Sequence, residues 1–274
     1  MMTFAKAGDG ALNYYPCRYG RSRLVFRGPK RTPEPPFCAV IGGSETYGKF
    51  VETPFPDLLE ARTGMMTLNL GCLNAGVDAF LGDPAALELV ARARVRVVQA
   101  MGAQNMSNRF YVVHPRRNDR FLRASGMLKA LYPGVDFTAF AFTGHMLDLL
   151  RRSAPDLFPV VVTELQMAWQ ARMRTLAERL DGPKVLLVVR GAVDQDNVLG
   201  SAPVFVTDAM EAAVAPAFDR VVRVRVPPGA RGTQGMVFSE LEGPAAAAMP
   251  GPAVHEEIAA ALAPVVVDLA GNVG

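Results

Sequence analysis

The sequence predicts an α/β protein built on a doubly wound, flavodoxin-like sheet of five parallel strands with helices on both faces. From residue 37 onwards, apolar runs of strand length alternate with segments of helical periodicity. This alternation is typical of parallel strands that are joined by crossover helices. The chain has 274 residues, of which 50% are hydrophobic, so it can bury a sizeable core.

The elements of this sheet can be placed along the chain. Strands are expected at residues 37–41, 66–70, 95–101, 184–189 and 220–226. Helices are expected at residues 56–62, 84–93, 159–180, 207–217 and 252–269. Within the third of these helices, Leu165, Trp169 and Met173 recur at helical spacing. We therefore expect Trp169 and Met173 in the core rather than at a cofactor.

Two segments fall outside the regular alternation. Residues 1–36 are expected to form an N-terminal extension that packs on the core, and residues 37–274 to form the α/β domain. Residues 106–158 interrupt that domain after its third strand. Long insertions in compact domains commonly carry function, so we expect this one to form a lid or subdomain near the site.

Charge and composition argue against several classes of protein. The formal net charge is only +3 and the acidic and basic residues are interspersed, so we expect no nucleic-acid partner and no membrane partner. No apolar run reaches the length of a membrane span, and the chain does not open with a signal-peptide pattern. Three separated cysteines and three dispersed histidines indicate neither a disulfide framework nor a metal site. We expect a cytoplasmic protein without metal or cofactor, whose oligomeric state the sequence leaves open.

The segment FCAVIGGSETYGKF, residues 37–50, leads an apolar run into a glycine-rich turn and permits two interpretations. Its glycine and lysine spacing nearly matches a phosphate-binding loop. That motif needs a serine or threonine after the lysine to bind magnesium, whereas Phe50 stands there. Pro54 and Pro56 would also interrupt a helix that begins at the lysine. Nucleotide binding is therefore the least favoured interpretation, and the other is a serine nucleophile at Ser44.

Four short segments bear on the serine interpretation. Ser44 follows the first predicted strand, Gly71 the second and Asn105 the third, while His255 lies in the turn into the last helix. Parallel strands end at the same edge of a sheet, so these residues are expected at one site. In their order and placement, the four segments resemble the sequence blocks of the SGNH, or GDSL-like, serine hydrolase superfamily.

This resemblance implies a role for each residue. In that family a serine is the nucleophile and a histidine is the base, which implies Ser44 and His255 here. The oxyanion is held by the backbone amide of the serine, the backbone amide of a glycine and the side chain of an asparagine. In this chain these groups would come from Ser44, Gly71 and Asn105. The resemblance covers roughly residues 37–105 and 184–270. The family normally has an aspartate three residues before the histidine, and Pro252 stands there. The alternative orienting group is a backbone carbonyl or an acid such as Glu240 or Glu242 from the preceding loop.

The predicted insertion carries a cluster of basic residues. The stretch HPRRNDRFLR sets His114 beside Arg116 and Arg117, and His145 follows in the same insertion. Guanidinium groups bind carboxylate or phosphate in a bidentate manner. These four residues are therefore candidate substrate-binding residues, provided that the insertion folds over Ser44. The stretches CRYGRSRLVFRGP and HPRRNDRF also resemble a family of bacterial proteins to which no activity is attached.

Two functional hypotheses follow. The favoured one is an SGNH-like serine esterase, acylhydrolase or acyltransferase that acts on an ester, either of a carbohydrate or of a small anionic metabolite. It needs no cofactor, because the serine, the histidine and the oxyanion donors suffice. The alternative is a catalytically inactive module of the same fold that binds an anionic ligand or partner. Ester hydrolysis that depends on His255 would distinguish the two.

Overall fold

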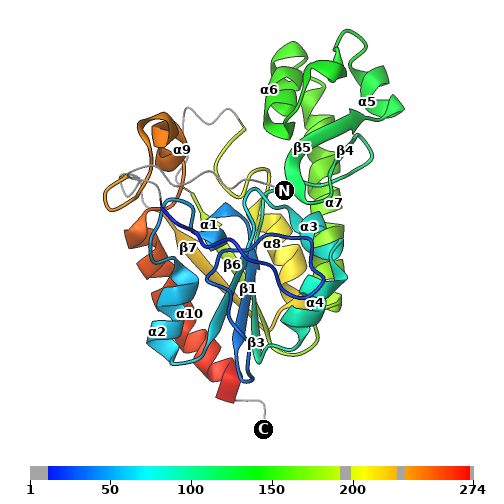
Figure 1. Cartoon of the computed structure of the whole chain (residues 1–274). Helices are drawn as coiled ribbons and strands as arrows, with labels where there is room; N and C mark the ends of the chain where they lie inside the picture. Colours follow the sequence, from blue (N-terminus) through cyan, green and yellow to red (C-terminus); the bar gives the residue numbers. More distant parts are fainter. Residues whose placement is uncertain (1–11, 192–198, 227–231, 272–274) are drawn as a thin grey trace.

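A five-stranded, all-parallel sheet lies at the centre of the molecule (Figure 1). The computed structural model describes residues 12–191, 199–226 and 232–271. The strands are β1 (Cys38–Gly42), β2 (Thr67–Gly71), β3 (Val95–Gln99), β6 (Lys184–Arg190) and β7 (Arg220–Arg225), in the spatial order β2-β1-β3-β6-β7. Numbered by their place in the chain, the strands have the flavodoxin-like order 2-1-3-4-5, whose switch point lies between β1 and β3.

Helices cover both faces of this sheet, so the predicted doubly wound α/β fold is confirmed. On one face lie α2 (Phe55–Thr63) and α10 (Pro252–Gly271). On the other face lie α3 (Val77–Leu81), α4 (Pro84–Ala91), α7 (Phe158–Glu178) and α8 (Asp208–Val214). Successive strand residues point to opposite faces, so Val40 packs in the first layer and Ile41 in the second. Trp169 and Met173 are fully buried in the second layer, as predicted.

Local sequence explains where several helices begin and end. The carboxylate of Asp83 caps α4 by accepting a hydrogen bond from the Ala86 N–H (3.0 Å), and a proline follows it at the first helical position. The helix expected at residues 207–217 ends at Val214 and continues as the short 3-10 helix η2 (Ala215–Ala217). Pro216 explains this change because it has no N–H to donate within an α-helix.

The N-terminal arm, residues 12–36, is bonded to the core through buried groups. Phe26 is fully buried in the larger hydrophobic cluster. The buried Arg27 guanidinium donates hydrogen bonds to three carbonyl oxygens, those of Tyr47 (3.2 Å), Gly48 (2.7 Å) and Glu52 (2.6 Å). Because these carbonyls lie at the end of α1 (Ser44–Tyr47) and in the loop after it, the arm fixes the connection that leaves the carboxyl end of β1.

The insertion after β3 forms a separate unit at the carboxyl edge of the sheet, beside the upper end of α7 (Figure 1). Its elements are β4 (Tyr111–His114), β5 (Arg117–Ala124), α5 (Gly126–Leu131), the 3-10 helix η1 (Phe137–Ala139) and α6 (Thr143–Ser153). The two strands pair antiparallel. Asn118 is fully buried, and its Oδ1 accepts hydrogen bonds from the N–H groups of Gly76 (2.9 Å) and Ala79 (3.0 Å). The insertion is thereby joined to the loop after β2 and to the first turn of α3.

A short segment flanks the carboxyl edge on its other side (Figure 1). It comprises the 3-10 helix η3 (Glu240–Glu242) and α9 (Gly243–Ala247), and it leads into α10. In the described part of the chain, no helix combines the length and the apolar character needed to cross a membrane.

Candidate functional site

Gln99, at the end of β3, organises the turn that follows β1. Its Oε1 accepts hydrogen bonds from the Gly43 N–H (3.1 Å), the Thr46 N–H (3.2 Å) and the Thr46 hydroxyl (2.5 Å). Its Nε2 donates to the Glu45 carboxylate (2.8 Å). Gln99 is buried, so these bonds are shielded from competition with water. One side chain thus fixes both the first turn of α1 and the carboxylate of Glu45.

Ser44 lies at the start of α1, and the loop after β2 holds its hydroxyl. The Asn74 N–H donates to Ser44 Oγ (2.9 Å), and Oγ donates to Asn74 Oδ1 (3.2 Å). Only 8% of Ser44 is exposed. An amide oxygen is a weak base, so this arrangement orients the hydroxyl without activating it.

Asn105 extends this hydrogen-bond network into the insertion. Its Nδ2 donates to the Asn74 carbonyl oxygen (3.2 Å), and its Oδ1 accepts from the Thr143 hydroxyl (2.9 Å). The Asn74 side chain in turn donates to Asp119 Oδ2 (3.2 Å). Ser44 and Asn105 are therefore brought into one site, as the sequence predicts, with the insertion directly beside it.

These residues line a pocket of about 210 Å³ at the switch point between β1 and β3. Its polar lining comprises one hydroxyl, four side-chain amides and one carboxylate, from Ser44, Asn74, Gln99, Gln104, Asn105 and Glu45. Its apolar lining includes Met101, Val189, Pro203, Val204 and Met249. Within the described structure, none of its lining residues is a lysine, an arginine or a histidine. The single formal charge among the described lining residues is therefore negative.

Gly71 lies at the end of β2, and its amide already has a partner. The Gly71 N–H donates to Asn69 Oδ1 (3.0 Å), and Gly71 is not among the residues that line the pocket. A Cβ at this position would overlap the backbone nitrogen of Tyr47. The described structure thus explains the glycine by the close approach of α1 to β2.

His255 lies in the first turn of α10, where it packs on α2. Its Nδ1 accepts a hydrogen bond from the Phe55 N–H (3.0 Å), and its ring stacks on the Phe55 ring with centroids 5.9 Å apart. Burial, and secondarily the Arg27 charge, lower the pKa of His255 from 6.5 to about 3. An accepting Nδ1 assigns the proton of the neutral ring to Nε2.

The structure therefore does not bring His255 to Ser44 in the way that the resemblance implies. His255 is not among the pocket residues, and the turn before α10 contributes Met249 instead. A histidine whose pKa is about 3 and whose Nε2 carries a proton is not a base near neutral pH. Its buried contacts explain it as a link between α10 and α2.

The four basic candidates of the insertion also lie outside the pocket lining. Arg116 and Arg117 are exposed, and His114 Nδ1 accepts a hydrogen bond from the Arg116 N–H (3.2 Å). His145 is exposed and contacts the Phe140 ring edge-on, with centroids 5.2 Å apart. The insertion instead contacts the site through Asp119 and Thr143, which form hydrogen bonds with Asn74 and Asn105. The four basic candidates form no part of these contacts.

Three residues of the site were not predicted from the sequence: Asn74, Gln99 and Glu45. Each lies within a segment that the sequence already marked, in LNLGCLNAG, VVQAMGAQN and GGSETYG respectively. Gln99 carries the clearest signal, because it is a polar residue that follows the apolar pair Val97 and Val98 at the end of a buried strand. Within the described residues, no group of three or more His, Cys, Asp or Glu side chains could hold a metal ion.

Fold and site together define a doubly wound α/β protein with a small polar pocket at its switch point. A family model described as a domain of unknown function, DUF6473, matches residues 2–270, so the chain belongs to that family. Comparisons with curated proteins and with solved structures find no match. The function must therefore be inferred from the geometry of the site.

Proposed function

We propose that the switch-point pocket binds a small, uncharged molecule rich in hydroxyl groups, such as a sugar or a polyol. The position of the 210 Å³ pocket carries this proposal, because doubly wound sheets bind ligands where the strand order reverses. Amide side chains both donate and accept hydrogen bonds, which suits hydroxyl groups. The lining has no cation among the described residues, which argues against the anionic ligand of the alternative hypothesis drawn from the sequence.

Two acceptors in the pocket support a ligand that donates hydrogen bonds. Gln99 binds Oε2 of Glu45, which leaves that carboxylate an oxygen for a ligand. Gln104 also lines the pocket, and its Oε1 is buried without a hydrogen-bond partner among the described residues. An unpaired buried acceptor costs on the order of 1–3 kcal/mol. A ligand hydroxyl at this wall would supply the missing donor.

Acyl transfer by Ser44 is the second candidate, favoured by the presence of Ser44 and Asn105 in one pocket. That chemistry needs a base for the serine hydroxyl. The Ser44 proton is directed to the Asn74 amide, and Met249 occupies the wall where the turn before α10 meets the pocket. Glu45 would then have to serve as the base. Acyl transfer ranks second because it requires Glu45 to act as the base for Ser44.

Ligand binding is tested by saturation-transfer NMR and thermal shift with a panel of neutral sugars and polyols, each paired with its phosphorylated form. We expect a neutral member to bind and to raise Tm. Glu45→Ala should weaken that binding about tenfold or more, since a hydrogen bond to a charged group contributes roughly 1.5–3 kcal/mol. Glu178→Ala, an exposed change in α7, is the matched control. Preferential binding of the phosphorylated forms that Glu45→Ala weakens would contradict the proposal, because the change would place those anions in the switch-point pocket.

Incubation with a fluorophosphonate probe and with nitrophenyl acetate separates the two candidates. The binding hypothesis predicts no labelling and no turnover, and only a few-fold loss of sugar affinity in Ser44→Ala. Labelling of the wild-type protein that disappears in Ser44→Ala would instead establish acyl chemistry at Ser44.

A further inference from the structure

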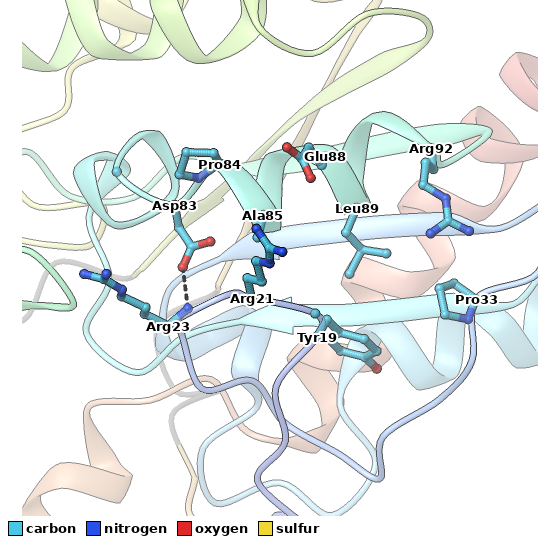
Figure 2. A pocket seen from close by; sticks show the side chains of 12 residues that line it. Tyr19, Arg21, Arg23, Pro33, Asp83, Pro84, Ala85, Glu88, Leu89 and Arg92 are labelled. Atoms are coloured by element: carbon cyan, nitrogen blue, oxygen red, sulfur yellow. Dashed lines mark hydrogen bonds between the residues drawn. The ribbon is translucent and has the colours of Figure 1, made fainter.

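A second and larger hollow, of about 900 Å³, lies between the N-terminal arm and α4 (Figure 2). It shares no lining residue with the switch-point pocket. Its volume is within the range of roughly 300–1,000 Å³ that small-molecule sites occupy. On the arm side this hollow is lined by Arg21 and Arg23, to which the sequence assigned no role.

The walls of this arm–α4 groove are fixed by buried groups. In the arm, Cys17 and Phe26 pair as an antiparallel bridge, and Gly20 takes a positive φ of 52° in the turn between them. Asp83, at the start of α4, accepts hydrogen bonds from the Ser22 hydroxyl (3.0 Å) and the Arg23 N–H (2.8 Å). The same carboxylate caps α4, so its hydrogen bonds are used to hold the two walls together.

The groove has an excess of positive charge. Arg21, Arg23 and Arg92 line it, and no hydrogen bond or ion pair joins their guanidinium groups to any residue that the structure describes. The opposing free charge on the lining is the carboxylate of Glu88, because Asp83 already bonds the arm. Guanidinium groups without carboxylate partners are suited to bind external anions.

The charges are separated by an apolar stretch. Figure 2 shows Arg21 reaching from the arm towards α4, and Arg92 at the far end of the helix. Leu89 and Tyr19 lie between them. Both of these side chains are largely buried, so they form a rigid apolar floor of the groove.

We propose that the arm–α4 groove binds a small organic phosphate, with its phosphate groups at the arginines of one end and its apolar or planar part on Leu89 and Tyr19. Phosphate matches guanidinium geometry, and the apolar floor suits an organic body rather than a bare ion. This site is independent of the switch-point pocket, where the lining charge is negative. The two pockets thus select opposite kinds of ligand.

Isothermal titration calorimetry with ADP as the probe, and with adenosine as the uncharged counterpart, tests this site. ADP should bind at low salt, more weakly as salt increases, and much more tightly than adenosine. The double variant Arg21→Gln/Arg92→Gln should lose at least tenfold in ADP affinity. Glu88→Gln should gain affinity several-fold, because it removes the opposing carboxylate. All three positions are exposed, so the fold should tolerate these changes.

Two matched controls complete this test. Arg116→Gln removes an exposed arginine of the insertion, outside the groove, and should leave ADP affinity unchanged. Glu45→Ala, in the other pocket, should also leave it unchanged, which separates this proposal from the proposed function. Absence of ADP binding at millimolar concentration, equal binding of adenosine, or full ADP affinity in the double variant would each overturn the proposal.

Discussion

At the scale of single residues, Gly76 determines how closely two loops of the site approach each other. A Cβ at this position would overlap the carbonyl oxygen of Asn105. Asn105 in turn binds the Asn74 carbonyl, and Asn74 holds the hydroxyl of Ser44. The geometry at Ser44 therefore depends on a residue that contributes no side chain.

Gly76→Ala should lower the free energy of unfolding by about 3 kcal/mol, because overpacking against backbone cannot be relieved by rotating a side chain. Urea denaturation measures this loss. Gly126→Ala is the control, since a Cβ at that first residue of α5 meets nothing within 4 Å. It should change stability by less than about 1 kcal/mol. Equal effects of the two substitutions would show that the loops are not tightly packed.

At this scale the sequence predicts the positions of residues but not their hydrogen-bond partners. It placed Ser44 and Asn105 at strand ends, because the pattern of apolar runs locates each strand end. It could not show that Gln99 turns its amide back to α1, or that His255 accepts a bond from Phe55. Those contacts depend on side-chain directions at helix and strand ends, which spacing in the sequence does not encode.

At the scale of elements, the contact between α10 and α2 contains the buried His255. Its Nδ1 caps the start of α2 by accepting from the Phe55 N–H (3.0 Å). Burial lowers the pKa of His255 from 6.5 to about 3. Between these two pH values the unfolded chain binds a proton at this ring and the folded chain does not. The contribution of the neutral ring is therefore complete above about pH 6.5 and is lost as the pH falls towards 3.

Urea unfolding between pH 4.5 and 7 measures this effect. Over that window the wild-type protein should lose up to about 1.4 kcal/mol per pH unit from this group. His255→Gln keeps an acceptor but does not titrate, so its stability should depend less steeply on pH. Carboxylates titrate in both proteins, and the difference between the curves isolates His255. Parallel curves would show that His255 is protonated in the fold.

The helices and strands with a clear apolar periodicity were predicted with bounds that lie within a few residues of the observed ones. The five strands and the long helix α7 have enough apolar residues to show a pattern. The helices α1 and α3 were missed because four or five residues make little more than one turn. The insertion was located but its hairpin was not, because β5 carries the charged sequence RNDRFLRA.

At the scale of the whole molecule, the insertion and the core are hydrogen-bonded to each other at the carboxyl edge of the sheet. Asn118 of β5 accepts from two core amides, and Thr143 donates to Asn105. The buried Tyr111 hydroxyl also donates to the Gln104 carbonyl (2.7 Å). The sequence predicted a lid or subdomain near the site, but only the structure shows that its hydrogen bonds to the core are buried.

We therefore expect the insertion and the core to unfold as one cooperative unit. Asn118→Ala would leave the buried Gly76 N–H without a partner and would remove one of the two acceptors of the Ala79 N–H, at a cost on the order of 1–3 kcal/mol. Urea denaturation, followed both by Trp169 fluorescence in the core and by far-UV circular dichroism, should show a single transition at lower urea. Hydrogen exchange at residues 76–79 should accelerate. Arg116→Ala, two residues away and exposed, is the matched control and should leave both measurements unchanged. A core transition that stays unchanged in Asn118→Ala would mean that the insertion is an independent domain, and that the site does not depend on it.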